Sequence, residues 1–141
     1  MKDGFIKVAA VTPQVRVADV AYHVQQIEEA MEQSAKAGAM ITVFPELCLT
    51  GYSCHDLFYQ RTLLQQAKSG LLSLAKKTEN LAGIYFVGLP WEWQGKLYNV
   101  AAALHGGKVL GLVPKTYLPT YAEFYEGRQF TRGMQQVVMS N

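Results

Sequence analysis

The sequence has 141 residues, half of them hydrophobic, and its formal net charge at pH 7 is +2. This length suits one domain with a packed core, and the apolar content argues against intrinsic disorder. Lys76-Lys77 is the single Lys/Arg doublet and no apolar run approaches the length of a membrane span, so neither nucleic acid nor membrane is an expected partner.

The first third of the chain predicts a strand, a helix and a second strand. Residues 5–11 are mostly apolar, and residues 41–44 form a short apolar and β-branched run that reads as a buried strand. Between them, Asp19 is placed as the N-cap or a first-turn acid of a helix that Gly38 ends. Its apolar stripe recurs at spacings of three and four: Val20, Val24, Ile27, Met31 and Ala35. A strand–helix–strand unit implies a parallel pair.

The rest of the chain predicts a second helix and a strand meander. The helix covers residues 61–78, with an inner stripe at Leu64, Ala67, Leu71, Leu74 and Thr78 and a helix-weakening Gly70 at its middle. A third buried strand at 84–90 ends at a proline, and residues 91–96 read as a turn. Two strands at 97–105 and 108–113 are joined by Gly106-Gly107, a hairpin signal. The expected sheet is therefore mixed.

The two cysteines give no metal site. Cys48 and Cys54 match none of the common zinc spacings, so both are interpreted as free thiols and no metal is expected. Cys48 follows Glu46 by two residues and would project to the same side if the strand continued. The N-terminus lacks the apolar core of a signal peptide, so a cytoplasmic protein is expected.

Two predicted strands end in the same way, with a proline followed by a charged residue. Glu46 follows Pro45, and Lys115 follows Pro114. Since ligands of open α/β sheets bind at the carboxyl ends of strands, Glu46 and Lys115 could share a site, with the carboxylate accepting a proton and the ammonium stabilising an oxyanion. The residues alone also allow a structural ion pair or two unrelated surface charges.

These motifs resemble those of the nitrilase, or carbon–nitrogen hydrolase, superfamily. The likeness rests on Phe-Pro-Glu-Leu at 44–47, Thr-Gly-Tyr at 50–52 and Pro-Lys-Thr-Tyr-Leu at 114–118, and it extends from about residue 5 to residue 133. It implies that Glu46 is the general base and that Lys115 stabilises the tetrahedral intermediate. It also implies an α/β fold, the first half of an α-β-β-α sandwich, in which a mixed sheet carries its helices on one face.

Two further segments, residues 50–58 and 118–130, resemble the glutaminase domain of bacterial glutamine-dependent NAD+ synthetases. That resemblance implies that Glu126 assists beside the lysine and that Tyr52 and Tyr121 line a glutamine pocket. It further implies that ammonia from glutamine amidates deamido-NAD+ in a separate domain that uses ATP and Mg, and that the protein forms a homo-oligomer.

The family's nucleophilic cysteine stands in a motif beyond the lysine, and neither Cys48 nor Cys54 matches it. Residues 1–141 are therefore expected to be the N-terminal part of a glutaminase domain, inactive alone, with no cofactor of its own. A stand-alone amidase and a non-catalytic truncated module remain alternatives.

Overall fold

The computed structural model describes residues 4–50 and 61–114. Four of the predicted site residues, Tyr52, Lys115, Tyr121 and Glu126, lie outside these ranges, as does Cys54.

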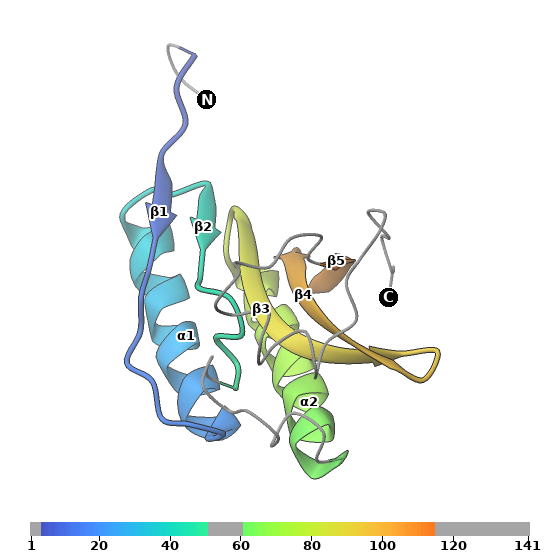
Figure 1. The fold of residues 1–141 in the computed structure, drawn as a ribbon. Coiled ribbons are helices and arrows are strands. Elements are labelled where there is room, and N and C mark those ends of the chain that lie inside the picture. The colour runs from blue at the N-terminus through green and yellow to red at the C-terminus, as the bar shows by residue number, and fades with distance from the viewer. Residues whose placement is uncertain (1–3, 51–60, 115–141) are drawn as a thin grey trace, which may run out of the picture.

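Within the described residues, five strands form one mixed sheet in the order β1-β2-β3-β4-β5 (Figure 1). The first three strands run parallel and the last three form an antiparallel meander, as the sequence predicts. Their bounds are β1 Val8–Ala10, β2 Ile41–Val43, β3 Ile84–Trp93, β4 Lys96–His105 and β5 Lys108–Pro114.

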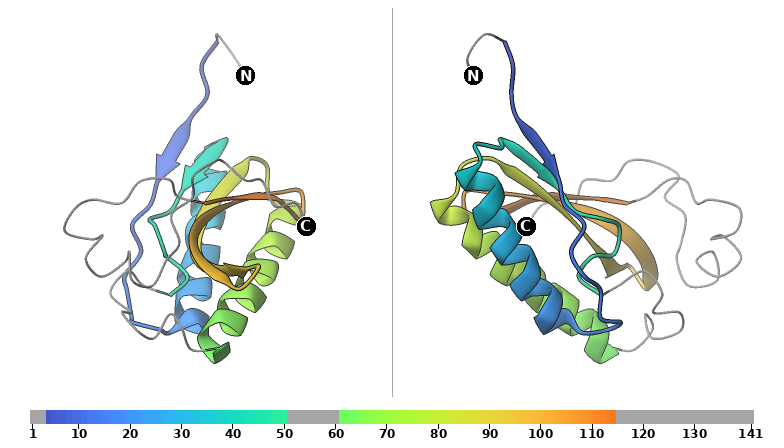
Figure 2. Two further views of the ribbon diagram at one scale, coloured as in Figure 1. Left: turned by 45° about the vertical axis from the view of Figure 1, so that its right-hand side comes forward. Right: turned by 90° about the vertical axis from the view of Figure 1, so that its left-hand side faces the viewer.

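Two helices, α1 (Val20–Lys36) and α2 (Arg61–Lys77), lie side by side on one face of this sheet (Figures 1 and 2). A short 3-10 turn, η2 (Thr78–Asn80), follows α2. The α1 caps are the predicted ones, because the Asp19 carboxylate accepts from the Tyr22 N–H and Gly38 takes a φ of 86° just past the helix end. Neither helix of the described ranges is long and apolar enough to cross a membrane.

The core lies between the two helices and the sheet. Alternate residues of β3 and β4 point into it, which is the period expected of a sheet covered on one face. Its fully buried side chains include Ile27, Met31, Leu71, Leu74, Tyr85, Val87, Leu89 and Leu104.

Gly70 marks the close approach of α2 to α1. A Cβ at this position would lie 2.9 Å from Val24 Cγ2 and 3.1 Å from Val20 Cγ1, so an added methyl group fits only if these two side chains shift slightly. The glycine that weakens the helix in a sequence-based prediction thus stands where the two helices pack closely.

Two predicted strand limits are wrong. The first strand is Val8–Ala10, shorter than the predicted 5–11. The third strand does not stop at Pro90, which stays in register with Asn99, and β3 continues to Trp93. Because β2 pairs with β3 only as far as Phe86 and the following turn bonds to β3 at Gly88, no described strand pairs with Pro90 on that edge, where a proline is tolerated.

The two hairpin turns differ from one another in how well the sequence predicts them. Gly106 and Gly107 have φ values of 60° and 83°, so the predicted hairpin is confirmed, with His105 facing Lys108. The β3–β4 turn is narrower than the predicted 91–96 and consists of Gln94 and Gly95, again both at positive φ.

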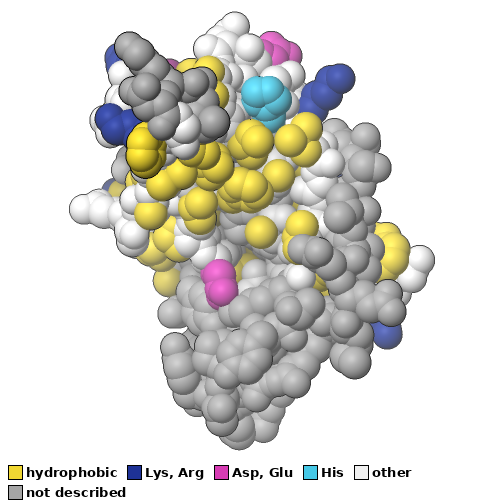
Figure 3. Space-filling view, turned by 90° about the horizontal axis from the view of Figure 1, so that it is seen from above, with side chains coloured by type: hydrophobic (Ala, Val, Ile, Leu, Met, Phe, Trp, Pro, Cys, Tyr) yellow, Lys and Arg dark blue, Asp and Glu magenta, His cyan; other side chains and the backbone are white. Residues whose placement is uncertain are grey.

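The sheet face opposite the helices carries apolar side chains without a cover in the described part of the chain. Val8 is 62% exposed and Val43 is 46% exposed, and Leu110 on β5 is 46% exposed. In a view from above, hydrophobic side chains gather in a broad band across this side of the molecule (Figure 3).

Candidate active site

Glu46 stands in a turn at the carboxyl end of the parallel strand β2. The strand ends at Val43, one further sheet-like bond joins the Phe44 N–H to the Phe86 carbonyl at 2.9 Å, and a turn then extends to Thr50. The Glu46 side chain is exposed, whereas residues 47–50 are buried. The carboxylate is therefore presented at the end of the sheet where open α/β proteins place their ligands, as the sequence predicts.

This turn lies directly against β3 at Gly88. The Leu49 N–H donates to the Gly88 carbonyl at 3.1 Å, and the Gly88 N–H donates to Cys48 Sγ at 3.3 Å. A Cβ on Gly88 would lie only 2.5 Å from the backbone nitrogen of Leu47 and 3.1 Å from the carbonyl carbon of Glu46. The absence of a side chain at Gly88 therefore sets how closely the Glu46 backbone approaches the sheet.

Leu47, the residue after Glu46, adopts a strained backbone conformation. Its φ is 52°, in the left-handed region that a leucine rarely occupies. Strain of this kind costs about 1–3 kcal/mol and persists only where the surroundings enforce it. Here the Leu47 side chain is fully buried and its carbonyl accepts from the Thr50 N–H at 3.1 Å. The turn is held in one conformation by packing and hydrogen bonds.

A buried histidine of α1 contacts the far end of the same turn. His23 is 2% exposed, its Nδ1 lies 3.0 Å from the Leu49 carbonyl oxygen, and the Arg16 N–H donates to its Nε2 at 2.9 Å. A backbone carbonyl only accepts and a backbone N–H only donates, so the ring is neutral with its proton on Nδ1. A third bond, from the Ala18 N–H to the Thr50 carbonyl at 2.8 Å, joins the same two segments.

Cys48 is not placed to act as a nucleophile. Its thiol is buried, and burial raises its pKa from 9.0 to about 12, although the nearby Gly88 backbone opposes that shift. Because the attacking species is the thiolate, a neutral buried thiol is inert. The expectation that Cys48 shares a side with Glu46 is wrong, since residues 46–50 form a turn and the alternation of an extended strand does not apply.

No group of three His, Cys, Asp or Glu side chains suited to a metal ion occurs within residues 4–50 and 61–114. Of the predicted site residues, only Glu46 falls in these ranges. How it stands relative to Lys115, Glu126, Tyr52 and Tyr121 therefore stays a prediction.

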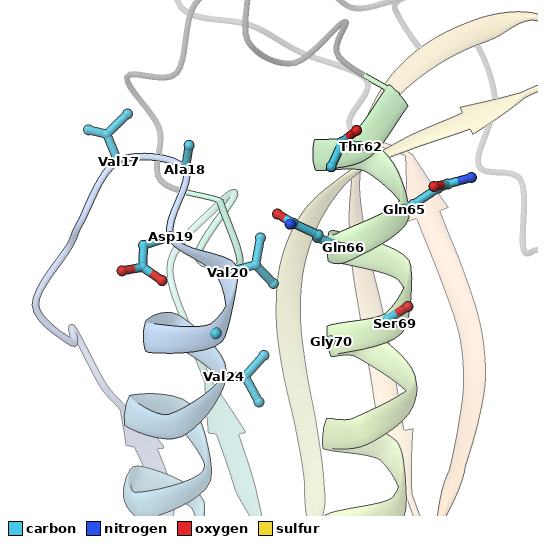
Figure 4. Close-up of a pocket in the computed structure, with 11 residues that line it drawn as sticks. Val17, Ala18, Asp19, Val20, Val24, Thr62, Gln65, Gln66, Ser69 and Gly70 are labelled. Atoms are coloured by element: carbon cyan, nitrogen blue, oxygen red, sulfur yellow. The ribbon is translucent and has the colours of Figure 1, made fainter.

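A groove of about 760 Å³ opens between the N-terminal ends of α1 and α2. Figure 4 shows Val20 and Val24 of α1 facing Gln66 and Gly70 of α2 across it. The groove does not include Glu46, although its floor is near the turn, because Leu49 Cδ2 would lie 3.5 Å from a Cβ on Gly70. The groove is therefore separate from the strand-end turn that carries Glu46.

Sequence reasoning missed two residues that fix this turn, and both left a signal. His23 is spaced three residues after Val20 and four before Ile27, so it is a polar residue on the core-facing stripe of α1. Gly88 interrupts an otherwise bulky strand, and glycine within a strand often marks a close backbone approach.

The fold and the turn define an α/β protein that presents a carboxylate at the end of a parallel strand. Its family follows from the sequence: the chain belongs to the carbon-nitrogen hydrolase family, whose family model matches residues 7–138.

Individual relatives agree with this assignment. The chain is 41% identical over 130 residues to the glutamine-dependent NAD(+) synthetase of Mycobacterium tuberculosis and 33% identical over 123 residues to that of Aquifex aeolicus. These matches cover 92% and 87% of this chain but only 19% and 21% of the relatives, so the chain spans about one fifth of their length.

Solved structures show the same fold. A glutamine-dependent NAD(+) synthetase from Cytophaga hutchinsonii superposes with a TM-score of 0.81 at 28% identity, over 90% of this chain and 22% of that one. An amidase from Nesterenkonia sp. superposes with a TM-score of 0.76 at 21% identity, over 96% of this chain and 51% of that one. The predicted nitrilase-type fold, with helices on one face of a mixed sheet, is confirmed.

Proposed function

We propose that this chain forms part of a glutaminase that supplies ammonia for NAD+ synthesis, with Glu46 as the general base. The observation that carries the proposal is the placement of Glu46, exposed at the carboxyl end of β2 on a turn fixed by Gly88 and His23. The 41% identity to glutamine-dependent NAD(+) synthetases supports glutamine as the substrate.

In the proposed reaction, a thiolate attacks the carboxamide carbon of glutamine. The Glu46 carboxylate removes the proton from the attacking thiol and returns a proton to the leaving ammonia. The Lys115 ammonium stabilises the oxyanion of the tetrahedral intermediate, Glu126 orients the reacting groups, and Tyr52 and Tyr121 line the glutamine pocket. Water then releases glutamate from the thioester.

The nucleophile is proposed to come from outside these 141 residues. Cys48 is excluded by its burial and by its raised pKa, and Cys54 lacks the motif that the family places around its nucleophile. The chain alone is accordingly proposed to be inactive. Amidation of deamido-NAD+ with ATP and Mg, assembly as a homo-oligomer and a cytoplasmic location are likewise proposed for the complete protein.

Glutamine hydrolysis by the complete protein that carries this chain tests the proposal. Glu46→Gln keeps the shape of the side chain but cannot accept the proton, so we expect kcat for ammonia release to fall by at least about 100-fold. Lys115→Met is expected to cause a loss of about 100- to 1,000-fold. Cys48→Ser serves as the matched control, because its hydroxyl keeps an acceptor for the Gly88 N–H while removing the thiol, and it should retain most of the activity.

Two results would contradict the proposal. Glutaminase activity of the 141-residue chain alone, abolished by Cys48→Ala, would make Cys48 the nucleophile. A fully active Glu46→Gln protein would remove Glu46 from the mechanism.

A further inference from the structure

We infer that His23 is a positioning residue for Glu46 and acts through the Leu49 carbonyl. This inference rests on the proposed role of Glu46. His23 lies on α1, 23 residues before Glu46, and its ring is 2% exposed, so it does not itself meet a substrate from solvent.

The hydrogen bonds of His23 connect two segments that flank the site. Its Nδ1–H donates to the Leu49 carbonyl at 3.0 Å, while its Nε2 accepts from the Arg16 N–H at 2.9 Å. Arg16 belongs to the connection that leads into α1, and Leu49 belongs to the turn that carries Glu46. One neutral ring thus ties the turn to the start of α1.

The turn depends on such attachment because its backbone is strained. Leu47 is held at a φ of 52°, and Gly88 contacts the backbone of residues 45–47 from the sheet side. Gly88 fixes the turn from one side, and His23 fixes its end at Leu49 from the other. Losing the His23 bond leaves the Ala18 N–H to Thr50 carbonyl bond as the described link between these segments, so the weakened attachment lets residues 46–50 relax toward an unstrained conformation and moves the carboxylate away from the reacting thiol. A displacement of about 1 Å at a reacting group can reduce the rate on the order of 100-fold.

Two conservative variants separate the two hydrogen bonds. The amide nitrogen of Asn is as many bonds from the backbone as Nδ1 of His, so His23→Asn retains the donor to Leu49. The amide of Gln reaches as far as Nε2, so His23→Gln retains the partner of Arg16 but not the donor to Leu49. His23→Leu removes both.

The experiment measures kcat and KM for glutamine hydrolysis in the complete protein. We expect kcat to fall at least tenfold for His23→Leu and His23→Gln, with KM changing by less than about threefold, and His23→Asn to restore most of kcat. Met31→Ala is the structural control, because Met31 is also fully buried on α1 but lies about two turns further along it. It should lower the melting temperature without the selective loss of kcat.

The outcomes separate this inference from the proposed function. If Glu46→Gln is inactive while His23→Gln equals wild type, Glu46 stays the base and the inference about His23 is wrong. Equal kcat losses in His23→Asn, His23→Gln and Met31→Ala would also overturn it, since they would reflect lost stability alone. If His23→Leu does not fold, the difference in kcat between His23→Asn and His23→Gln still tests the inference. An active Glu46→Gln protein overturns the proposed function itself.

Discussion

At the scale of single residues, the polar groups around Glu46 bind the backbone of the turn. His23 contacts the Leu49 carbonyl and Cys48 contacts Gly88, so a ring and a thiol each satisfy main-chain groups that would otherwise be buried without partners. An unsatisfied buried group costs about 1–3 kcal/mol. Both side chains therefore support the turn that carries Glu46.

The thiol of Cys48 should resist alkylation over a wide pH range. Its pKa is raised to about 12, so at about pH 9 roughly one thiol in a thousand is ionised, against about half for a thiol with the ordinary pKa of 9.0. The pKa is raised because burial disfavours the charged thiolate.

The extent of Cys48 alkylation is measured by peptide-level mass spectrometry after brief treatment with iodoacetamide at about pH 7 to about pH 10. Protein unfolded in urea is the control. Cys48 should be modified only in urea. Rapid modification in native buffer, rising with pH as for an exposed thiol, would show that the site is open.

At the scale of elements, residues 45–47 can lie close to β3 because Gly88 has no side chain. A Cβ on Gly88 meets backbone atoms at 2.5 Å and 3.0 Å, which belong to Leu47 and Pro45 and cannot rotate away. A Cβ on Gly70 meets only the ends of the Val24 and Val20 side chains, which can adjust. Two glycines that look alike in the sequence thus tolerate an added methyl group differently.

Gly88→Ala should destabilise the protein by about 1–3 kcal/mol and also lower kcat, because the turn must move to admit the methyl group. Gly70→Ala is the matched control. Alanine is favoured over glycine within a helix by about 1 kcal/mol, which offsets the closer contact with the valines and leaves the free energy of unfolding almost unchanged.

Thermal unfolding and glutaminase assays of the two variants in the complete protein test the contrast. Equal stability and activity in both variants would mean that Gly88 does not set the position of the turn.

At the scale of the whole molecule, the sheet is covered on one face only within the described residues. Val8, Val43 and Leu110 stay exposed on the other side, and β1 and β5 are the two edges of the described sheet. Exposed apolar surface and open edges both favour association between chains.

We therefore expect the 141-residue chain alone to self-associate. The double variant Val8→Lys/Val43→Lys places charge on this face and should shift the sedimentation coefficient toward that of the monomer. Leu72→Lys is the control, since Leu72 is similarly exposed, at 48%, but lies on α2. A wild-type chain that sediments as a monomer at every concentration tested would contradict this expectation.

The sequence alone determined the order and type of the described elements and the position of Glu46 just after a parallel strand. Periodic apolar residues, Asp19, Gly38 and the Gly106-Gly107 pair act locally, so α1 and the last hairpin could be predicted from neighbouring residues. The placement of Glu46 could be predicted because a strand followed by proline delivers the next side chain to the sheet end, whereas its role as a base rests on the family resemblance and stays a prediction.

Only the tertiary structure decided what holds Glu46 in place. Gly88 is 42 residues from it and His23 is 23 residues away, and no local pattern states that both meet the same turn. The continuation of β3 through Pro90 depends likewise on where the neighbouring strand β2 ends. The interpretation of Cys48 changed most, because burial against the sheet, a property of the folded chain, raises the pKa of this thiol near Glu46 and makes it unreactive.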